Sequence, residues 1–130
     1  MKKNLLAVVA VAFIMLFAYQ PAFAGGHARI EGAELTKMMN SGTRMIIVDV
    51  REPELFARGH IPHAINIPYD TAKKRILKEL SPNDTIVFVC HGGPMGDELG
   101  EILTSNNYKK VYNVIGGMNR WTGAVSVGKK

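Results

Sequence analysis

Residues 85–103 read TIVFVCHGGPMGDELGEIL, and this stretch determines the fold expected for the whole chain. Its first five residues, 85–89, are apolar or β-branched and predict a short buried strand. Apolar residues at helical spacing predict a helix over 97–106. The glycine-rich segment 91–96 between them predicts a tight loop whose backbone N–H groups surround one point. Cys90 stands at that point and is the first candidate for chemistry.

Strand-like and helix-like segments alternate along the rest of the chain. Strands are predicted at 29–30, 45–48, 64–67 and 110–114, and helices at 32–40, 52–58, 69–80 and 118–124. The run at 45–48 is apolar without interruption, as in a strand that is buried on both faces of a parallel sheet. The alternation predicts an α/β fold with a five-stranded, mainly parallel sheet and helices on both faces.

Residues 1–24 have the three regions of an export signal in their usual order. A basic start over 1–3 precedes a continuous apolar stretch over 5–18, and the small residues Ala22 and Ala24 on either side of Phe23 provide a cleavage site. We expect cleavage after this segment and a periplasmic or secreted protein. The fourteen apolar residues fall short of the ~20 that span a bilayer, so no stable membrane span is expected after cleavage. An uncleaved anchor and a buried core helix are the alternatives.

The charge of the chain argues against a nucleic-acid partner. The formal net charge is +5 at pH 7, and loss of Lys2 and Lys3 with the signal lowers it to +3. The remaining basic residues are dispersed, with no basic stripe that alternates with aromatic residues. Binding to nucleic acid is therefore not expected.

The protein contains one cysteine, Cys90, which has no partner for an internal disulfide. In an exported protein, cysteines usually pair. Cys90 is therefore either an intermolecular link or a free reactive thiol, and the adjacent glycine loop favours the reactive thiol.

Four stretches, in order and at matching spacing, resemble the rhodanese family. They are DVR at 49–51, GHIP at 59–62 continued by AINIP at 64–68, CHGG at 90–93 and GGMNRW at 116–121. The chain is also similar to the exported, single-domain rhodaneses of the periplasmic phage-shock type. The resemblance implies one rhodanese-like domain, which we place at 28–127.

The resemblance further implies a sulfurtransferase without a cofactor. The Cys90 thiolate would take a sulfane sulfur from a small donor, become a persulfide, and pass the sulfur to cyanide or a thiol. A donor or acceptor protein is a further expected partner. The resemblance assigns binding of the transferred sulfur to the loop residues His91, Gly92, Gly93, Pro94, Met95 and Gly96.

Two loop positions depart from the family pattern. Many rhodaneses have arginine five residues after the cysteine and serine or threonine next, where this chain has Met95 and Gly96. Methionine cannot bind the sulfonate of thiosulfate as the planar fork of arginine does. The donor therefore stays open among thiosulfate, polysulfide and a persulfide. Related phosphatases need arginine one position later, at Gly96, which argues against phosphatase activity.

Four further side chains are candidates for the surroundings of Cys90. His91 could favour the thiolate as an imidazolium or could point to solvent. Asp49 and Arg51 could form an ion pair behind the loop, and His63 could face the pocket or cap its own loop. The spacing of these histidines with Cys90 does not support a metal site.

A second function remains open beside the enzyme. Without the loop arginine, the protein could be a sulfur carrier or binding module that holds sulfur on Cys90 for a partner, with little turnover alone. A scaffold without sulfur chemistry is disfavoured because Cys90 is present.

Overall fold

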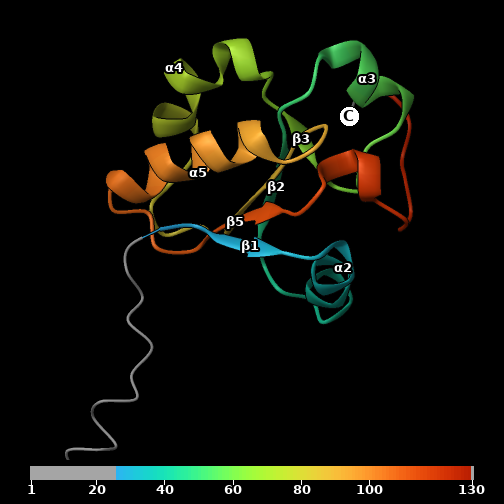
Figure 1. The fold of residues 1–130 in the computed structure, drawn as a ribbon, viewed down its shortest axis with the longest axis horizontal. Coiled ribbons are helices and arrows are strands. Elements are labelled where there is room, and N and C mark those ends of the chain that lie inside the picture. The colour runs from blue at the N-terminus through green and yellow to red at the C-terminus, as the bar shows by residue number, and fades with distance from the viewer. Residues whose placement is uncertain (1–25, 130) are drawn as a thin grey trace, which may run out of the picture.

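A computed structural model of the protein describes residues 26–129, so the expected export signal lies outside the described residues. Strands and helices alternate along the chain in the predicted order (Figure 1). The elements are β1 (Ala28–Ile30), α2 (Gly32–Asn40), β2 (Ile46–Asp49), α3 (Pro53–Arg58), β3 (Ile65–Asn66), α4 (Tyr69–Glu79), β4 (Ile86–Val89), α5 (Pro94–Ser105), β5 (Val111–Val114) and the 3₁₀ helix η1 (Gly117–Arg120). No helix within the described range is long and apolar enough to cross a membrane.

The five strands form one parallel sheet in the order β1-β5-β4-β2-β3. β4 lies at its centre, where Phe88 is opposite Val48 of β2 and Asn113 of β5, and all four residues of β4 are buried. Because the strands are parallel, their carboxyl ends share one edge of the sheet. The segments that follow β2, β4 and β5 therefore meet at that edge, where ligands bind in open α/β sheets.

Helices cover both faces of the sheet, as predicted. Successive residues of a strand point to opposite faces, so each face of β4 supports its own apolar cluster. On one face, Ile76 of α4 and Leu99 of α5 join Phe88 in a cluster. On the other face, Leu35 of α2 and Phe56 of α3 form the second cluster. Figure 1 shows α4 beside α5, and α2 across the sheet from them.

Helix α5 begins at Pro94, three residues earlier than the predicted start at 97. Proline suits the first position of a helix, because its φ is already helical and its missing N–H would have no partner there. Gly93 precedes it with φ 128°, a conformation that favours glycine. The loop after Cys90 is therefore only three residues long, and the expected loop over 91–96 ends at Gly93.

The end of the domain differs from the predicted helix over 118–124. The structure has one turn of 3₁₀ helix, η1, because Thr122 and Gly123 are poor helix formers. The chain then returns along α3, where the backbones of Ser126 and His60 exchange hydrogen bonds of 2.8 and 2.9 Å. These contacts attach the C-terminal segment to the edge of the sheet that carries Cys90.

Candidate active site

Cys90 directly follows β4 at the carboxyl edge of the sheet, and it is fully buried, with 0% of its surface exposed. The backbone N–H of Gly93 donates a hydrogen bond to its sulfur, at an N to Sγ distance of 2.8 Å. The N-terminus of α5, which carries a partial positive charge, lies at the same turn. Both features stabilise a negatively charged sulfur, so the turn suits a thiolate or a persulfide.

The 3₁₀ helix η1 supports this turn from behind. The carbonyl of Cys90 accepts a hydrogen bond from the N–H of Met118 (2.8 Å), and the carbonyl of His91 accepts one from the N–H of Asn119 (2.9 Å). Gly117 lies so close that a Cβ there would stand 2.2 Å from the carbonyl oxygen of Cys90. Both carbonyls are thus held by η1, and this close approach explains the second glycine of the GGMNRW stretch, Gly117.

Asn113 of β5 binds the carbonyl group of Gly93, whose N–H is bound to the sulfur. Its side-chain Nδ2 donates to the carbonyl of Gly93 (2.8 Å) and to Oδ1 of Asp97 (3.0 Å). Its amide group fills the space beside Gly96, where a Cβ would stand 2.0 Å from Oδ1. Gly93 is therefore held through its N–H by the sulfur and through its carbonyl by Asn113. The glycine at 96 makes room for that amide.

Sequence reasoning missed Asn113. One signal was available: a polar residue interrupts an apolar strand next to that strand's carboxyl end, where functional groups gather. Its partners lie 20 and 16 residues earlier in the chain, so no local pattern identifies them.

We expect Asn113→Ala to destabilise the fold by about 1–3 kcal/mol, because the buried carbonyl of Gly93 and the partly exposed carboxylate of Asp97 lose a donor. We also expect the folded variant to react about tenfold more slowly at Cys90, because the carbonyl of Gly93 is no longer held. Iodoacetamide alkylation measures this effect, and the variant and wild type should react equally in denaturant. Asn83→Ala, in an exposed turn, is the matched control and should leave both quantities unchanged. Equal folded-state alkylation rates would show that Asn113 does not position the turn.

Asp97, in the first turn of α5, binds the start of the described chain to the site. Its carboxylate accepts hydrogen bonds from His27 (2.7 Å), from both Nε and an Nη of Arg29 (3.0 and 2.8 Å), and from Asn113. Burial alone would raise the pKa of Asp97, but the hydrogen bonds of Arg29, His27 and Asn113 outweigh it and lower the pKa to about 2. Gly100 leaves the space that His27 occupies, since a Cβ would stand 2.7 Å from its Cγ.

The lowered pKa of Asp97 predicts an acid-dependent loss of stability. The ionised carboxylate stabilises the folded state above its usual pKa of 3.8, and this contribution disappears as the pH falls toward 2. Asp97→Asn should therefore cost about 1–2 kcal/mol at neutral pH and almost nothing near pH 2. Urea unfolding of both proteins across this range tests it, with Glu101→Gln on the same helix as the control. A difference that persists unchanged at pH 2 would contradict this interpretation.

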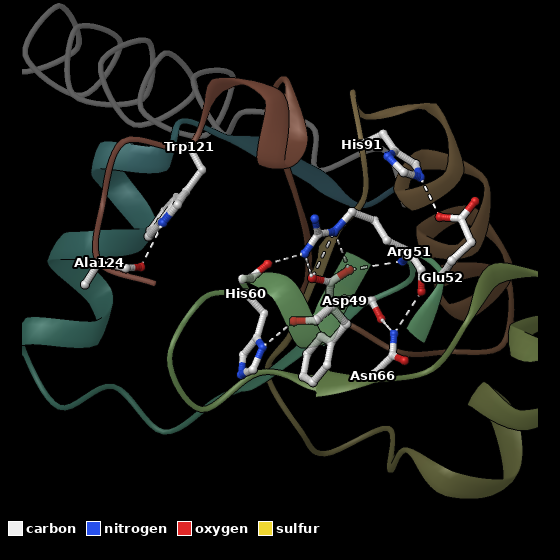
Figure 2. Close-up of polar contacts among 10 residues, drawn as sticks. Asp49, Arg51, Glu52, His60, Asn66, His91, Trp121 and Ala124 are labelled. Atoms are coloured by element: carbon white, nitrogen blue, oxygen red, sulfur yellow. Dashed lines mark hydrogen bonds and ion pairs between the residues drawn. The ribbon is translucent and has the colours of Figure 1, made fainter. Parts of the chain in front are cut away.

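His91 faces a carboxylate and not the sulfur. Its Nε2 lies 2.8 Å from Oε2 of Glu52, at the exposed rim of the site (Figure 2). The pKa of Glu52 is lowered by a hydrogen bond from the backbone N–H of Glu52 and by the hydrogen bond from His91. The His91 side chain is 39% exposed, which is closer to the solvent-facing expectation, and a role of the imidazolium at Cys90 stays a prediction. The imidazole joins the turn after Cys90 to the segment that precedes α3.

Asp49 and Arg51 form the expected ion pair, and it is buried. Arg51 donates to the carboxylate of Asp49 from Nε (3.0 Å) and from an Nη (2.7 Å), and that Nη also donates to the carbonyl of Gly59 (2.7 Å). Asn66 donates to the backbone carbonyls of both residues (Figure 2). This network fixes the turn between β2 and α3, and Val50 within it bonds to the carbonyl of Val89. The pair therefore braces the strand end next to Cys90.

His63 is not brought to the site. It precedes β3, which runs parallel to β2, so it lies at the edge of the sheet opposite Cys90. There it is exposed, with φ 69°, and lines a shallow hollow together with Arg44 and Met45. Within the described part of the chain, no three His, Cys, Asp or Glu side chains are placed to hold a metal ion.

A cavity of about 600 Å³ opens between α3, the start of α4 and the start of α5. Val50 and Met95 line it. Val50 belongs to the apolar cluster that contains Cys90, and Met95 packs against that cluster. Met95 is half-buried, so it lies between the cluster and the open space. Cys90 itself does not line the cavity, and Val50 and Met95 are the lining residues that connect the cavity wall to its apolar cluster.

Comparison with known proteins agrees with this geometry. The rhodanese-like domain family matches residues 31–124. The Bacillus subtilis protein named "Putative sulfur carrier protein YrkF" is 38% identical over 85 residues, or 65% of this chain and 45% of that protein. The chain thus spans less than half of that relative. The "Uncharacterized protein YqhL" of the same organism is 28% identical over 123 residues, covering 94% of this chain and 97% of that protein. A rhodanese-like domain protein from Staphylococcus aureus is 33% identical, with a TM-score of 0.69 over 77% of this chain and 97% of the other.

Proposed function

The chain belongs to the rhodanese-like domain family, and from that premise we propose that it is a sulfurtransferase which carries a sulfane sulfur on Cys90. The observation that carries the proposal is the hydrogen bond from the N–H of Gly93 to Sγ of Cys90, in a turn held from behind by η1. This turn provides main-chain stabilisation for an anionic sulfur without a metal or an added cofactor.

The proposed reaction has two steps. In the first, the Cys90 thiolate attacks the sulfane sulfur of the donor, the sulfur–sulfur bond of the donor breaks, and the remainder leaves with the electron pair. With thiosulfate the leaving group is sulfite. In the second, cyanide or a thiolate attacks the outer sulfur of the Cys90 persulfide, and the Cys90 thiolate is released together with thiocyanate or a new persulfide. The N–H of Gly93 stabilises the Cys90 thiolate before the first step and again when the second step releases it.

The identity of the donor depends on Met95. It stands on the first turn of α5, at the wall of the cavity, and its thioether provides no donor for a sulfonate. Thiosulfate should therefore be used more slowly than polysulfide or a persulfide.

Met95→Arg is expected to raise the rate of thiosulfate use about tenfold, because a guanidinium can bind two sulfonate oxygens at once. Thiocyanate formation at limiting thiosulfate measures the effect, and Met95→Gln, which is neutral, is the matched control. If both variants behave as wild type with thiosulfate, the side chain at 95 does not determine donor use.

A sulfur carrier with little turnover of its own is the alternative, and the 38% identical relative, which is named a sulfur carrier protein, favours it. Counting thiocyanate per protein molecule distinguishes the two. Above the uncatalysed reaction of polysulfide with cyanide, an enzyme forms many molecules of thiocyanate per Cys90, whereas a carrier that needs a partner protein forms about one. No thiocyanate above that background would contradict both functions.

We also propose that the protein acts outside the cytoplasm, in the periplasm or secreted, after removal of residues 1–24. The support is the order of the three signal regions in the sequence. Protein recovered from the envelope fraction should then begin near Gly25. Recovery of the chain with residues 1–24 attached to membranes would instead favour an anchored form.

A further inference from the structure

The cavity whose wall includes Val50 and Met95, two residues of the apolar cluster around Cys90, is acidic. Carboxylates at Glu52, Glu54 and Asp70 line it, against one guanidinium at Arg75, which leaves a net formal charge of −2. Arg75 is in turn bound through Nε and an Nη to both carboxylate oxygens of Glu79 (2.9 and 3.0 Å). Among the described residues, the cavity lining therefore contains no cation that is free to bind an anion.

The neighbouring lysine is also neutralised. Lys73 pairs with Glu98 of α5, which additionally accepts a hydrogen bond from the hydroxyl of Tyr69 in the cavity wall. The hydrogen bonds from Lys73 and Tyr69 lower the pKa of Glu98, which is therefore ionised at neutral pH. This bridge between α4 and α5 pairs Lys73 with a carboxylate, so Lys73 adds no unpaired positive charge beside the cavity.

The rest of the cavity wall is apolar and consists largely of Val50, Pro53, Pro68 and Met95. The cavity has a volume of about 600 Å³, which lies in the range of small-ligand sites. The hydrogen-bond donor nearest the reacting sulfur, the N–H of Gly93, is already directed at Sγ. A donor molecule in this cavity thus meets apolar side chains and negative charge.

We propose that the site selects small persulfides whose carrier bears a positive charge, such as persulfides of aminothiols, and discriminates against anionic donors. This inference rests on the proposed sulfurtransferase function and specifies its donor. The ammonium group would be attracted by Glu54 and Asp70 at the mouth, while the apolar part of the carrier contacts Met95 and Val50. A thiosulfate dianion would be repelled by the same carboxylates.

The transfer step balances without a further reactant. The Cys90 thiolate attacks the outer sulfur of R–S–SH, and the sulfur–sulfur bond breaks. The thiolate R–S⁻ leaves with the electron pair, and the S–H proton stays on the transferred sulfur, which gives Cys90–S–SH. No oxidant or reductant is consumed.

Two donors of equal length and opposite charge test the proposal: the persulfides of cysteamine and of 3-mercaptopropionate. Single-turnover loading of Cys90, followed by mass spectrometry, should be about tenfold faster with the cysteamine persulfide at low salt. At about 1 M salt the ratio should approach one, because charges are then screened within about 3 Å.

The double variant Glu54→Gln/Asp70→Asn should reduce the low-salt ratio to about two, since it removes two carboxylates from the cavity wall. The control Glu34→Gln/Glu101→Gln removes two exposed glutamates that do not line this cavity and should keep the wild-type ratio. Equal loading by both persulfides in the wild type, or an unchanged ratio in the cavity variant, would overturn this inference and leave the sulfurtransferase proposal intact. If neither persulfide loads Cys90, this inference fails, and the proposed function fails with it only if polysulfide and thiosulfate also leave Cys90 unmodified.

Discussion

Cys90→Ser is expected to abolish sulfur transfer, with a loss of at least about a thousandfold in thiocyanate formation. A serine hydroxyl is a poor nucleophile at neutral pH, and serine cannot form the persulfide that links the two steps. The fold should survive, because serine is close to cysteine in size and its oxygen can accept the hydrogen bond from the N–H of Gly93. Thiocyanate assays together with thermal unfolding measure the two properties separately.

The matched control for Cys90→Ser is wild-type protein alkylated with iodoacetamide. The protein contains one cysteine, so alkylation modifies that thiol alone among cysteine side chains. Both preparations should be inactive and folded. Substantial transfer by the serine variant would show that another group carries the sulfur.

Among glycine-to-alanine substitutions near the turn after Cys90, Gly117→Ala should reduce the free energy of unfolding the most, by about 2–4 kcal/mol. Its φ of 51° disfavours any residue with a side chain, and the new Cβ would stand 2.2 Å from the carbonyl oxygen of Cys90 and 2.7 Å from that of His91. These atoms are backbone and cannot move without displacing the turn that carries the sulfur. Transfer activity should therefore fall even where the variant remains folded.

Gly42→Ala separates the two causes of this loss. Gly42 has a similar positive φ, 73°, but no atom lies within 4 Å of the position of its Cβ. It should cost only about 1 kcal/mol, with full transfer activity. Urea unfolding and thiocyanate formation measure both variants. Equal losses in the two would mean that the positive φ alone, and not contact with the Cys90 turn, explains the effect.

Much of the fold could be predicted from the sequence because its determinants are local. The apolar run that became β4 is buried on both faces, and the alternation of strands with helices predicted the parallel sheet. Boundaries were less accurate. Pro94 was interpreted as part of the loop, although a proline after glycine also suits the first position of a helix, which is where the structure has it.

The site could be predicted only in part, because its remaining contacts join distant residues. The Asp49–Arg51 pair is two residues apart and was expected. The pairing of His91 with Glu52 joins residues 39 apart, and the bond from Asn113 to Gly93 joins residues 20 apart. Of the two positions considered for His63, a place in the pocket is wrong for the same reason. Only the direction of β3 in the sheet shows that this residue lies at the far edge.

The measurement that tests the central claim most directly is the mass of the Cys90 peptide after brief exposure of the protein to a persulfide, polysulfide or thiosulfate. A sulfurtransferase with Cys90 as its sulfur carrier should gain about 32 Da, the mass of one sulfur atom, on that peptide with at least one donor. Cyanide should remove the added mass and release an equal amount of thiocyanate. A Cys90 peptide that keeps its unmodified mass with all three donors would contradict the account.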